Sequence, residues 1–250
     1  MTKKVILDIE TIPDTDAMER AGYEDKGGFP PFVLHELACV SLLIVETDAK
    51  ARPEFAIESF SRERLSERGI IASVERVLAD SFEVITFNGR GFDVPVLMTR
   101  AALTGEDAPM IARLHTQRRY SQGLHVDLLD EVTGCGTAPR VRLHDLCSAF
   151  SIPSKIDVAG GDVASLVAAG EWTRVVNYCE TDVVATYLAM QFWRGAERGV
   201  PELAVENWSL LAQWVRANQP GLHHLLPYAE PPYRSGGPVL GALEYVELGW

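Results

Sequence analysis

The sequence predicts a layered α/β or α+β domain in which helices pack against a β-sheet. Three strand-like runs come first, a helical segment and a fourth strand follow, and the remainder is mostly helical. This order favours a sheet covered by helices, because each element must bury its apolar side against another layer. With 250 residues, 47% of them hydrophobic, the chain is long enough for one sizeable core.

The first three strands are indicated by short apolar runs. Residues 4–9 read as a strand, and residues 11–31, which contain EDKGGFPP, read as a long connection. The near-continuous apolar run at 38–45 is typical of a buried strand. Residues 53–60 alternate weakly and form the third expected strand.

Helical spacing of apolar residues follows at 63–79, and residues 82–87 (FEVITF) read as the fourth strand. A helix is expected after Asp93, and Pro95 is compatible with it because proline is tolerated in a first turn. Further helices are expected at residues 143–150, 162–169, 171–192 and 201–217, and the tail LPYAEPPYRSGGP reads as irregular.

Composition narrows the class of protein. No apolar run approaches the roughly 20 residues of a membrane helix, and the start MTKKVILDIETIP has too brief an apolar run for a signal peptide. The cysteines Cys39, Cys135, Cys147 and Cys179 lack metal-site spacing and read as free thiols in a reducing cytoplasm. We therefore expect a cytoplasmic protein that has no membrane partner.

Net charge is −12, which disfavours broad, non-specific binding of nucleic acid. It does not exclude a nuclease whose carboxylates hold cations. Basic side chains gather in one segment, namely Arg113, His115, Arg118, Arg119, His125, Arg140, Arg142 and His144. This segment predicts either a local positive lip or an ordinary solvated surface, and the sequence leaves both open.

Asp8 and Glu10 interrupt the first strand, in VILDIETIP. Side chains alternate across a strand, so both carboxylates project to the same side. Two like charges this close repel and burial penalises each, so a proton, a basic partner or a metal must offset them. For D-x-E alone, a strand end that has reached solvent is the favoured interpretation.

The sequence FNGRGFD, residues 87–93, follows the fourth strand. Two glycines bracket Arg90 and allow the backbone to bend sharply. Asp93 falls at the expected start of a helix, where Asp is a preferred N-cap, and Asn88 suits the step from strand to turn. The functional alternative is that Asp93 is a metal ligand and that Asn88 touches a bound ligand.

Tyr178 and Asp182 are four residues apart in YCETD and therefore share one face of a helix. They precede Cys179 and Val183 of the apolar stripe, which places them on its rim. A carboxylate there leans toward the edge of the core, whereas Glu180 falls elsewhere on the helix and is expected to be solvated. A rim Asp capped by a Tyr hydroxyl would explain the pair in isolation.

Together these motifs occur in one order, with D-x-E-T on a first strand, N-x-x-x-F-D after a later strand and Y-x-x-x-D on a late helix. The combination resembles the DEDDy class of 3′–5′ exonucleases in the ribonuclease H-like (DnaQ-like) superfamily. The second motif is most similar to that of the proofreading exonuclease domain of family-B DNA polymerases. The chain resembles the stand-alone predicted exonucleases related to that domain, over roughly residues 5–193, where HVDLLDEV and NYCETDVVATYL agree with them.

The resemblance implies two-metal hydrolysis of phosphodiester bonds, with two divalent cations, Mg²⁺ or Mn²⁺, held by oxygen ligands. Asp8 would bridge both ions, Glu10 and Asp182 would complete the site of the attacking water, and Asp93 would serve the second ion through water. Tyr178 would orient the attacking water, because a phenol with a pKa of about 10 is a poor general base.

The resemblance also implies substrate contacts. Thr11 would meet the terminal nucleotide, and Asn88 and Phe92 would hold the frayed single strand. Phe92 could stack on a base of any sequence, although a core position suits it equally well. The implied partner is a single-stranded or frayed 3′ end, with DNA favoured over RNA by the polymerase-like motif, and the implied products are 5′-mononucleotides. The acidic net charge predicts weak, salt-sensitive binding over a short footprint.

The implied fold is a ribonuclease H-like mixed five-stranded sheet, with three antiparallel strands, then parallel strands, and helices on both faces. The fifth strand is expected near residues 123–129, which brings His125 and Asp127 close to the cleft. They could support the site from behind its ligands, but a purely structural role is favoured. Residues 1–200 would form the exonuclease domain. Residues 201–250 would add a helix and an irregular tail that pack on the same domain.

Rival functions are disfavoured by the same motifs. A non-catalytic nucleic-acid-binding module on this fold would lack one of the four acids or the tyrosine. A ribonuclease H-like endonuclease or recombinase would lack the Y-x-x-x-D pair and the N-x-x-x-F-D turn. An acidic protein that binds Ca²⁺ incidentally would need a recognisable loop, and no EF-hand loop is present. A 3′–5′ exoribonuclease with the same site stays open as the alternative.

Overall fold

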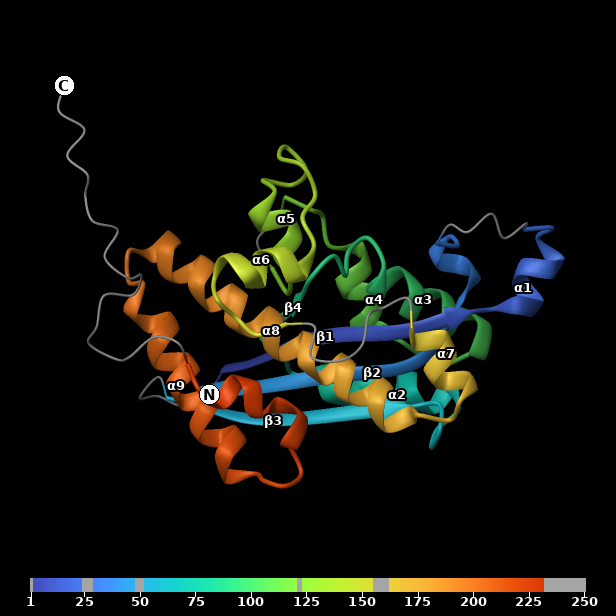
Figure 1. Cartoon of the computed structure of the whole chain (residues 1–250). Coiled ribbons are helices and arrows are strands. Elements are labelled where there is room, and N and C mark those ends of the chain that lie inside the picture. Colours follow the sequence, from blue (N-terminus) through green and yellow to red (C-terminus); the bar gives the residue numbers. More distant parts are fainter. Residues whose placement is uncertain (1, 24–28, 48–51, 121–122, 155–161, 232–250) are drawn as a thin grey trace.

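The computed structural model describes residues 2–23, 29–47, 52–120, 123–154 and 162–231. Within them one mixed sheet has the strand order β3-β2-β1-β4-β5 (Figure 1). Its strands are β1 (Thr2–Pro13), β2 (His35–Thr47), β3 (Pro53–Ser61), β4 (Glu83–Thr86) and β5 (His125–Asp127). The expected mixed five-stranded fold, including the fifth strand near residue 125, is confirmed.

Pairing along β1 creates an open edge near its middle. β1 runs antiparallel to β2 over its whole length, and β2 runs antiparallel to β3. The parallel pairing of β1 with β4 covers only three residues, which end at Ile6. Asp8 and Glu10 follow that point, so they lie where β1 has separated from β4. The register with β2 shifts between Glu10 and Thr11, which bends the strand just beyond the two acids.

Helices connect and cover the strands. They are α1 (Thr15–Arg20), α2 (Glu67–Leu78), α3 (Asp93–Thr104), α4 (Pro109–Thr116), α5 (Leu128–Val132), α6 (Leu143–Ala149), α7 (Val163–Ala168), α8 (Trp172–Arg198) and α9 (Glu202–Ala217). Short 3₁₀ segments occur at η1 (Phe32–Leu34) and η3 (His223–Ala229). None of the helices in the described part of the chain has both the length and the apolar composition needed to cross a bilayer.

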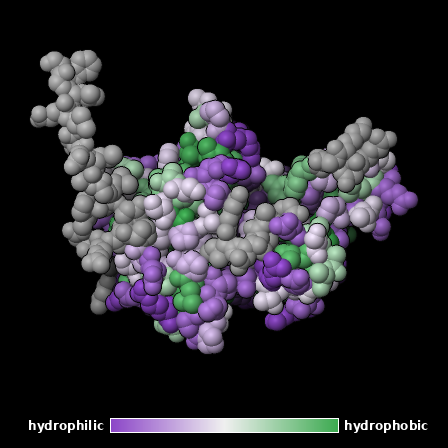
Figure 2. Space-filling view, in the orientation of Figure 1, coloured by the Kyte–Doolittle hydropathy of each residue, from purple (hydrophilic) through white to green (hydrophobic). Residues whose placement is uncertain are grey.

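The sheet separates two layers of helices. α8 crosses one face with α7 and α9 beside it, and α2, α3 and α4 cover the other face (Figure 1). Alternate residues of β1 serve the two layers, since Ile6 packs with α8 whereas Val5 and Leu7 pack with α2 and α3. The surface in Figure 2 mixes small hydrophobic areas with hydrophilic ones, consistent with apolar side chains buried on both faces of the sheet.

α8 is the longest helix, and it positions the motif that carries Asp182. Its buried residues, such as Val183 and Leu188, pack on β1 and β2. The helix ends at Gly199, whose φ of 68° gives the left-handed conformation that glycine adopts without strain. The expected helix at 171–192 therefore continues for six more residues, through Gly195, and ends where the chain turns left-handed at Gly199.

Several element boundaries differ from the sequence-based expectation. α2 begins at Glu67 rather than residue 63, because the Ser66 side chain caps it by accepting from the N–H of Gly69. α1, α4 and α5 are not predicted, because helices of five to eight residues give a weak periodic signal, although the equally short α6 and α7 are predicted. The paired glycines of EDKGGFPP and residues 232–238 of the irregular tail lie outside the described residues.

The segment after α8 packs back on the same core. Trp208 of α9 and Tyr228 of η3 are fully buried, and the Trp208 indole N–H donates to the Tyr228 carbonyl at 2.9 Å. Both side chains belong to the cluster that contains Ile6 of β1. The division expected at residue 200 stays a prediction.

Candidate active site

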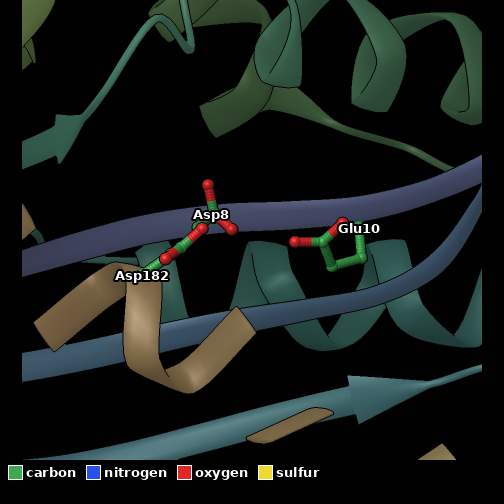
Figure 3. Close-up of side chains that lie close together, drawn as sticks. All are labelled: Asp8, Glu10 and Asp182. Atoms are coloured by element: carbon green, nitrogen blue, oxygen red, sulfur yellow. The ribbon is translucent and has the colours of Figure 1, made fainter. Parts of the chain in front are cut away.

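Three carboxylates from two elements meet beside the open part of β1. Asp8 and Glu10 lie on β1 and Asp182 lies on α8, and one oxygen of each lies within 4.8 Å of the other two. Figure 3 shows Asp8 and Asp182 pointing toward each other, with the Glu10 carboxylate turned toward Asp8. The two-residue spacing directs both β1 acids toward α8, while Leu7 and Ile9 pack in the opposite layer.

Burial makes the negative charge of this cluster unfavourable. Burial, followed by repulsion from neighbouring carboxylates, raises the pKa of Asp8 and of Glu10 far above the usual range. Burial also raises the pKa of Asp182 to about 7. Among the described residues, no basic side chain stands among the main influences on these pKa values. A group of carboxylate oxygens without an internal cation fits the ligand preference of hard divalent metals.

Asp93 adds a fourth carboxylate from the first residue of α3. Its side chain is buried, and its Oδ1 has no hydrogen-bond partner among the described residues. Burial raises its pKa to about 7, and its charge in turn raises the pKa of Asp8. The N-cap position belongs to Phe92, so N-capping does not explain Asp93. The unpartnered oxygen is one that a cation or a water molecule would satisfy.

Tyr178 lies one helical turn before Asp182, as its spacing predicts. Burial, followed by the charge of Asp182, raises the pKa of Tyr178 above its ordinary value of 10. A hydrogen bond from the phenol lowers the pKa of Asp182, against the larger effect of burial. The phenol therefore stays protonated at neutral pH, where it can donate a hydrogen bond and cannot act as a base.

The sequence matches a family model described as "Predicted 3′-5′ exonuclease related to the exonuclease domain of PolB" over residues 27–229. The chain belongs to this family. The matched range includes Asp93, Tyr178 and Asp182 and begins after Asp8 and Glu10. The structure therefore supplies the link between the β1 acids and the part of the chain that the family model covers.

Solved structures of nucleic-acid enzymes resemble this exonuclease-family chain. A family B DNA polymerase from the archaeon Pyrobaculum calidifontis is 19% identical, with a TM-score of 0.54 over 92% of this chain and 27% of the polymerase. E. coli exonuclease I in complex with a dA16 oligonucleotide is 15% identical, with a TM-score of 0.49 over 90% of this chain and 45% of exonuclease I. The polymerase comparison supports the fold. Comparison with curated proteins gave no match.

The turn before α3 has a tightly specified backbone. Asn88 has a φ of 65°, and a Cβ on Gly89 would lie 2.5 Å from the Thr86 side chain. Asp127 on β5 accepts the N–H groups of Asn88 at 2.8 Å and Arg90 at 2.9 Å. Asp127 thus closes the turn that leads into α3, which is a structural role.

His125 also supports this region rather than the carboxylate cluster. Its Nε2 lies 2.9 Å from the Thr86 hydroxyl, and burial lowers its pKa to about 4, so the ring is neutral at neutral pH. The Gln117 side chain pairs with both the N–H and the carbonyl of His125. This pairing occupies the outer edge of the short strand β5.

Thr11 and Phe92 meet through His35. The Thr11 hydroxyl lies 3.0 Å from His35 Nδ1, and the rings of His35 and Phe92 lie edge to face with centroids 5.3 Å apart. His35 Nε2 lies 3.1 Å from the Pro30 carbonyl, which can only accept, so Nε2 carries the proton. Burial lowers the pKa of His35, which keeps the ring neutral, and the Thr11 hydroxyl therefore donates to Nδ1. Phe92 is partly buried at the edge of the core.

A cleft of about 370 Å³ opens onto Asp8 and Asp182. Its walls include Asn88, Arg140 and Arg142, and the Arg140 guanidinium donates to the Asn88 side-chain oxygen. The cleft is thus lined by both carboxylates and arginines. Asn88 lies in this cleft, where the sequence predicts a ligand contact.

The remaining basic residues do not extend this wall. Arg113 and Arg119 line a different hollow, of about 1000 Å³, beside residues that precede β4 and β5. The cleft at Asp8 instead lies beside residues that follow these strands. Arg119 also pairs with Asp130. The basic segment therefore forms no single lip, and only its end at Arg140 and Arg142 reaches the candidate site.

The expectation that Glu180 is solvated is wrong. Its side chain is 12% exposed, accepts a hydrogen bond from Ser59 at 2.6 Å and pairs with His224 at 2.7 Å. Ser59 comes from β3 and His224 from η3, which cover that side of α8. Helical periodicity gives no sign of this burial, because both partners are distant in sequence.

Cys179 is a neighbour of the cluster that the sequence analysis assigns only to the apolar stripe. Its Sγ lies 3.4 Å from the Asp8 carbonyl oxygen and 3.5 Å from Asp8 Oδ2. The thiol therefore donates a hydrogen bond to Asp8 and lies on the core side of the carboxylate cluster. Its position three residues before Asp182 on the same helix is a signal that could have suggested this proximity.

Proposed function

We propose that this chain is a DEDDy-type 3′–5′ exonuclease that hydrolyses phosphodiester bonds at the 3′ end of single-stranded nucleic acid and releases 5′-mononucleotides. DNA is the favoured substrate, and two divalent cations, Mg²⁺ or Mn²⁺, are the proposed cofactors. Membership of the exonuclease family sets the reaction class. The subtype, the metals and the substrate are our inference from the site.

The carboxylate cluster is the observation that carries this proposal. One oxygen each of Asp8, Glu10 and Asp182 lies within 4.8 Å of the other two, and Asp93 Oδ1 has no hydrogen-bond partner in the described part of the chain. Such an arrangement destabilises a metal-free protein, because like charges repel and burial removes their hydration. In a purely structural cluster, the acids would have to be protonated or paired with basic side chains to offset this negative charge. Divalent cations would offset this negative charge, and carboxylate oxygens are the ligands that they prefer.

The four acids would hold the cations. Asp8 would be the central ligand, because its carboxylate lies between those of Glu10 and Asp182. When bound, the cations supply Lewis-acid chemistry that activates water and stabilises the charge on the reacting phosphate. Tyr178 would orient the attacking water through its hydroxyl, since its raised pKa keeps the proton in place. Thr11 would meet the last nucleotide, and Asn88 and Phe92 would hold the frayed single strand.

The walls of the cleft support a nucleic-acid substrate. Arg140 and Arg142 face the same 370 Å³ cleft as Asp8 and Asp182, and guanidinium groups bind phosphates well. The chain has a net charge of −12 and two arginines line its cleft. We therefore expect a short, salt-sensitive contact with the nucleic-acid strand. DNA is favoured by the polymerase-like N-x-x-x-F-D turn and by the structural likeness to a DNA polymerase.

The test uses a 5′-labelled single-stranded oligonucleotide, as DNA and as RNA, with Mg²⁺, with Mn²⁺ and with chelator. We expect a ladder of shortened products and 5′-mononucleotides with either metal and none with chelator. Asp8→Ala and Asp182→Ala should abolish the ladder. The matched control is Glu202→Ala, which removes an exposed acid of α9 and should keep full activity.

Each outcome bears on a separate part of the proposal. Absence of shortening with every metal and both substrates would refute the exonuclease. Faster degradation of RNA than of DNA would overturn the substrate preference and favour the exoribonuclease. Activity that persists in the Asp8→Ala protein would show that the cluster is not the catalytic site.

A further inference from the structure

An exposed aromatic ring packs against residues linked to chain neighbours of the candidate acids. Phe29 is 73% exposed, although its ring centroid lies 4.6 Å from that of His35 and 5.3 Å from that of Phe92. One side of the ring is therefore supported and the rest faces solvent. A single exposed Phe is ordinary, so its meaning depends on what lies around it.

Two contacts connect Phe29 to residues that are next to the carboxylates in the chain. Its ring contacts Phe92, the residue immediately before Asp93. Its ring also contacts His35, which is bonded to the hydroxyl of Thr11, the residue immediately after Glu10. The two connections reach the cluster from different elements, α3 and β1.

His35 holds this arrangement in place. Its ring is 2% exposed, and its Nε2 donates to the carbonyl of Pro30, the residue that follows Phe29. The same ring contacts both phenylalanines and accepts the Thr11 hydroxyl through Nδ1. The buried, neutral side chain of His35 thus holds the ring of Phe29 in place, with the rest of that ring exposed.

We propose that Phe29, supported by His35 and Phe92, is a stacking platform for an unpaired nucleobase at the 3′ end of the strand. The inference rests on the proposed function and adds a base-binding residue to it. An unpaired base is the fitting occupant, because it offers a flat π-face and the adjacent cluster acts on the phosphate of the same nucleotide. Stacking on an aromatic ring tolerates every base, which suits an exonuclease that acts without regard to sequence.

The first test compares the kinetics of Phe29→Ala with those of Phe82→Ala. Phe82 is a matched control, since it is 65% exposed but lines the hollow that includes residues before β4. We expect Phe29→Ala to raise KM about tenfold and to change kcat little, because one lost base–aromatic stack corresponds to roughly a 5- to 150-fold change in affinity. The Phe82 variant should match the wild type.

A substrate whose last nucleotides lack their bases makes the test specific. With this abasic 3′ end, the difference between wild type and Phe29→Ala should disappear, because no base is left to stack. Equal kinetics for Phe29→Ala, Phe82→Ala and wild type on normal DNA would overturn the platform while leaving the exonuclease intact. A tenfold effect that persists on the abasic end would also overturn it.

The second test measures binding without turnover. Phe29→Trp is placed in an Asp182→Asn background, which removes one charge of the cluster, and a 5′-labelled oligothymidylate is titrated in the presence of Mg²⁺. We expect the strand to quench the added indole emission, and Phe82→Trp in the same background to show no quenching. Binding by anisotropy without quenching, or no binding at all, would overturn the platform. Quenching with a wild-type protein that never hydrolyses DNA would support the platform and refute the exonuclease.

Discussion

Asp93→Asn replaces a buried carboxylate with a neutral side chain of the same shape. Burial raises the pKa of Asp93 from 3.8 to about 7, so the folded protein holds this charge less readily than the unfolded chain does. At pH 8 the ionised group costs roughly 4 kcal/mol, because each pH unit between the two values corresponds to ~1.4 kcal/mol. We therefore expect Asp93→Asn to stabilise the metal-free protein.

The pH dependence gives the sign of the effect. A folded pKa above the unfolded value means that the acid lowers stability as pH rises from about 4 to about 7, and that the loss is complete above pH 7. At pH 5 the same arithmetic leaves only ~2 kcal/mol. The stabilisation by Asp93→Asn should therefore be large at pH 8 and small at pH 5.

Thermal unfolding in chelator measures this directly. For a chain of this size ~4 kcal/mol corresponds to a rise in Tm of about 10 °C, which we expect at pH 8. Added Mg²⁺ or Mn²⁺ should raise the Tm of the wild type, because an ion that binds only the folded state stabilises it. The same ions should stabilise Asp93→Asn much less, since one proposed ligand has lost its charge.

Asp127→Asn is the matched control. Asp127 is equally buried but accepts backbone N–H groups with both oxygens, so an amide there would set an N–H against an N–H and lower the Tm at both pH values. If Asp93→Asn instead lowered the metal-free Tm at pH 8, the Asp93 carboxylate would be a stabilising structural group. The argument for a metal ligand at this position would then be refuted.

Three further changes test other parts of the site. Tyr178→Phe should slow hydrolysis at least tenfold. Metal binding, measured by calorimetry, should stay nearly intact, and its loss would contradict a water-positioning role. Arg140→Ala should raise KM severalfold and reduce the salt slope of binding by about one, which a salt titration would detect; an unchanged slope would exclude a phosphate contact. Gly89→Ala should lower the Tm by several degrees, because its Cβ would meet the Thr86 side chain at 2.5 Å, and an unchanged melting curve would contradict the tight turn.

Periodicity alone predicts the long elements well. The apolar runs of β1 and β2 and the helical spacing of α8 and α9 give their type and approximate position, because each buries several apolar side chains. The short elements α1, α4 and α5 carry fewer than three turns each, and their formation depends on packing against the rest of the molecule.

The candidate site could be anticipated for a different reason. The D-x-E spacing places Asp8 and Glu10 on one side of a strand whatever surrounds it, and the Y-x-x-x-D spacing does the same on a helix. Local geometry cannot say that the two pairs meet. Their meeting depends on α8 crossing β1 at this point, which is a long-range contact.

Sequence order and spacing thus decided the fold class, the family resemblance and the candidate acids, since local backbone geometry sets which side chains share a face. Tertiary packing decided everything that depends on distant partners. It separated β1 from β4 after Ile6, left an oxygen of Asp93 unpartnered, buried Glu180 and brought Phe29 beside Phe92. Burial and charge proximity arise only when remote segments are assembled, and these two effects turn four ordinary acids into a candidate metal site.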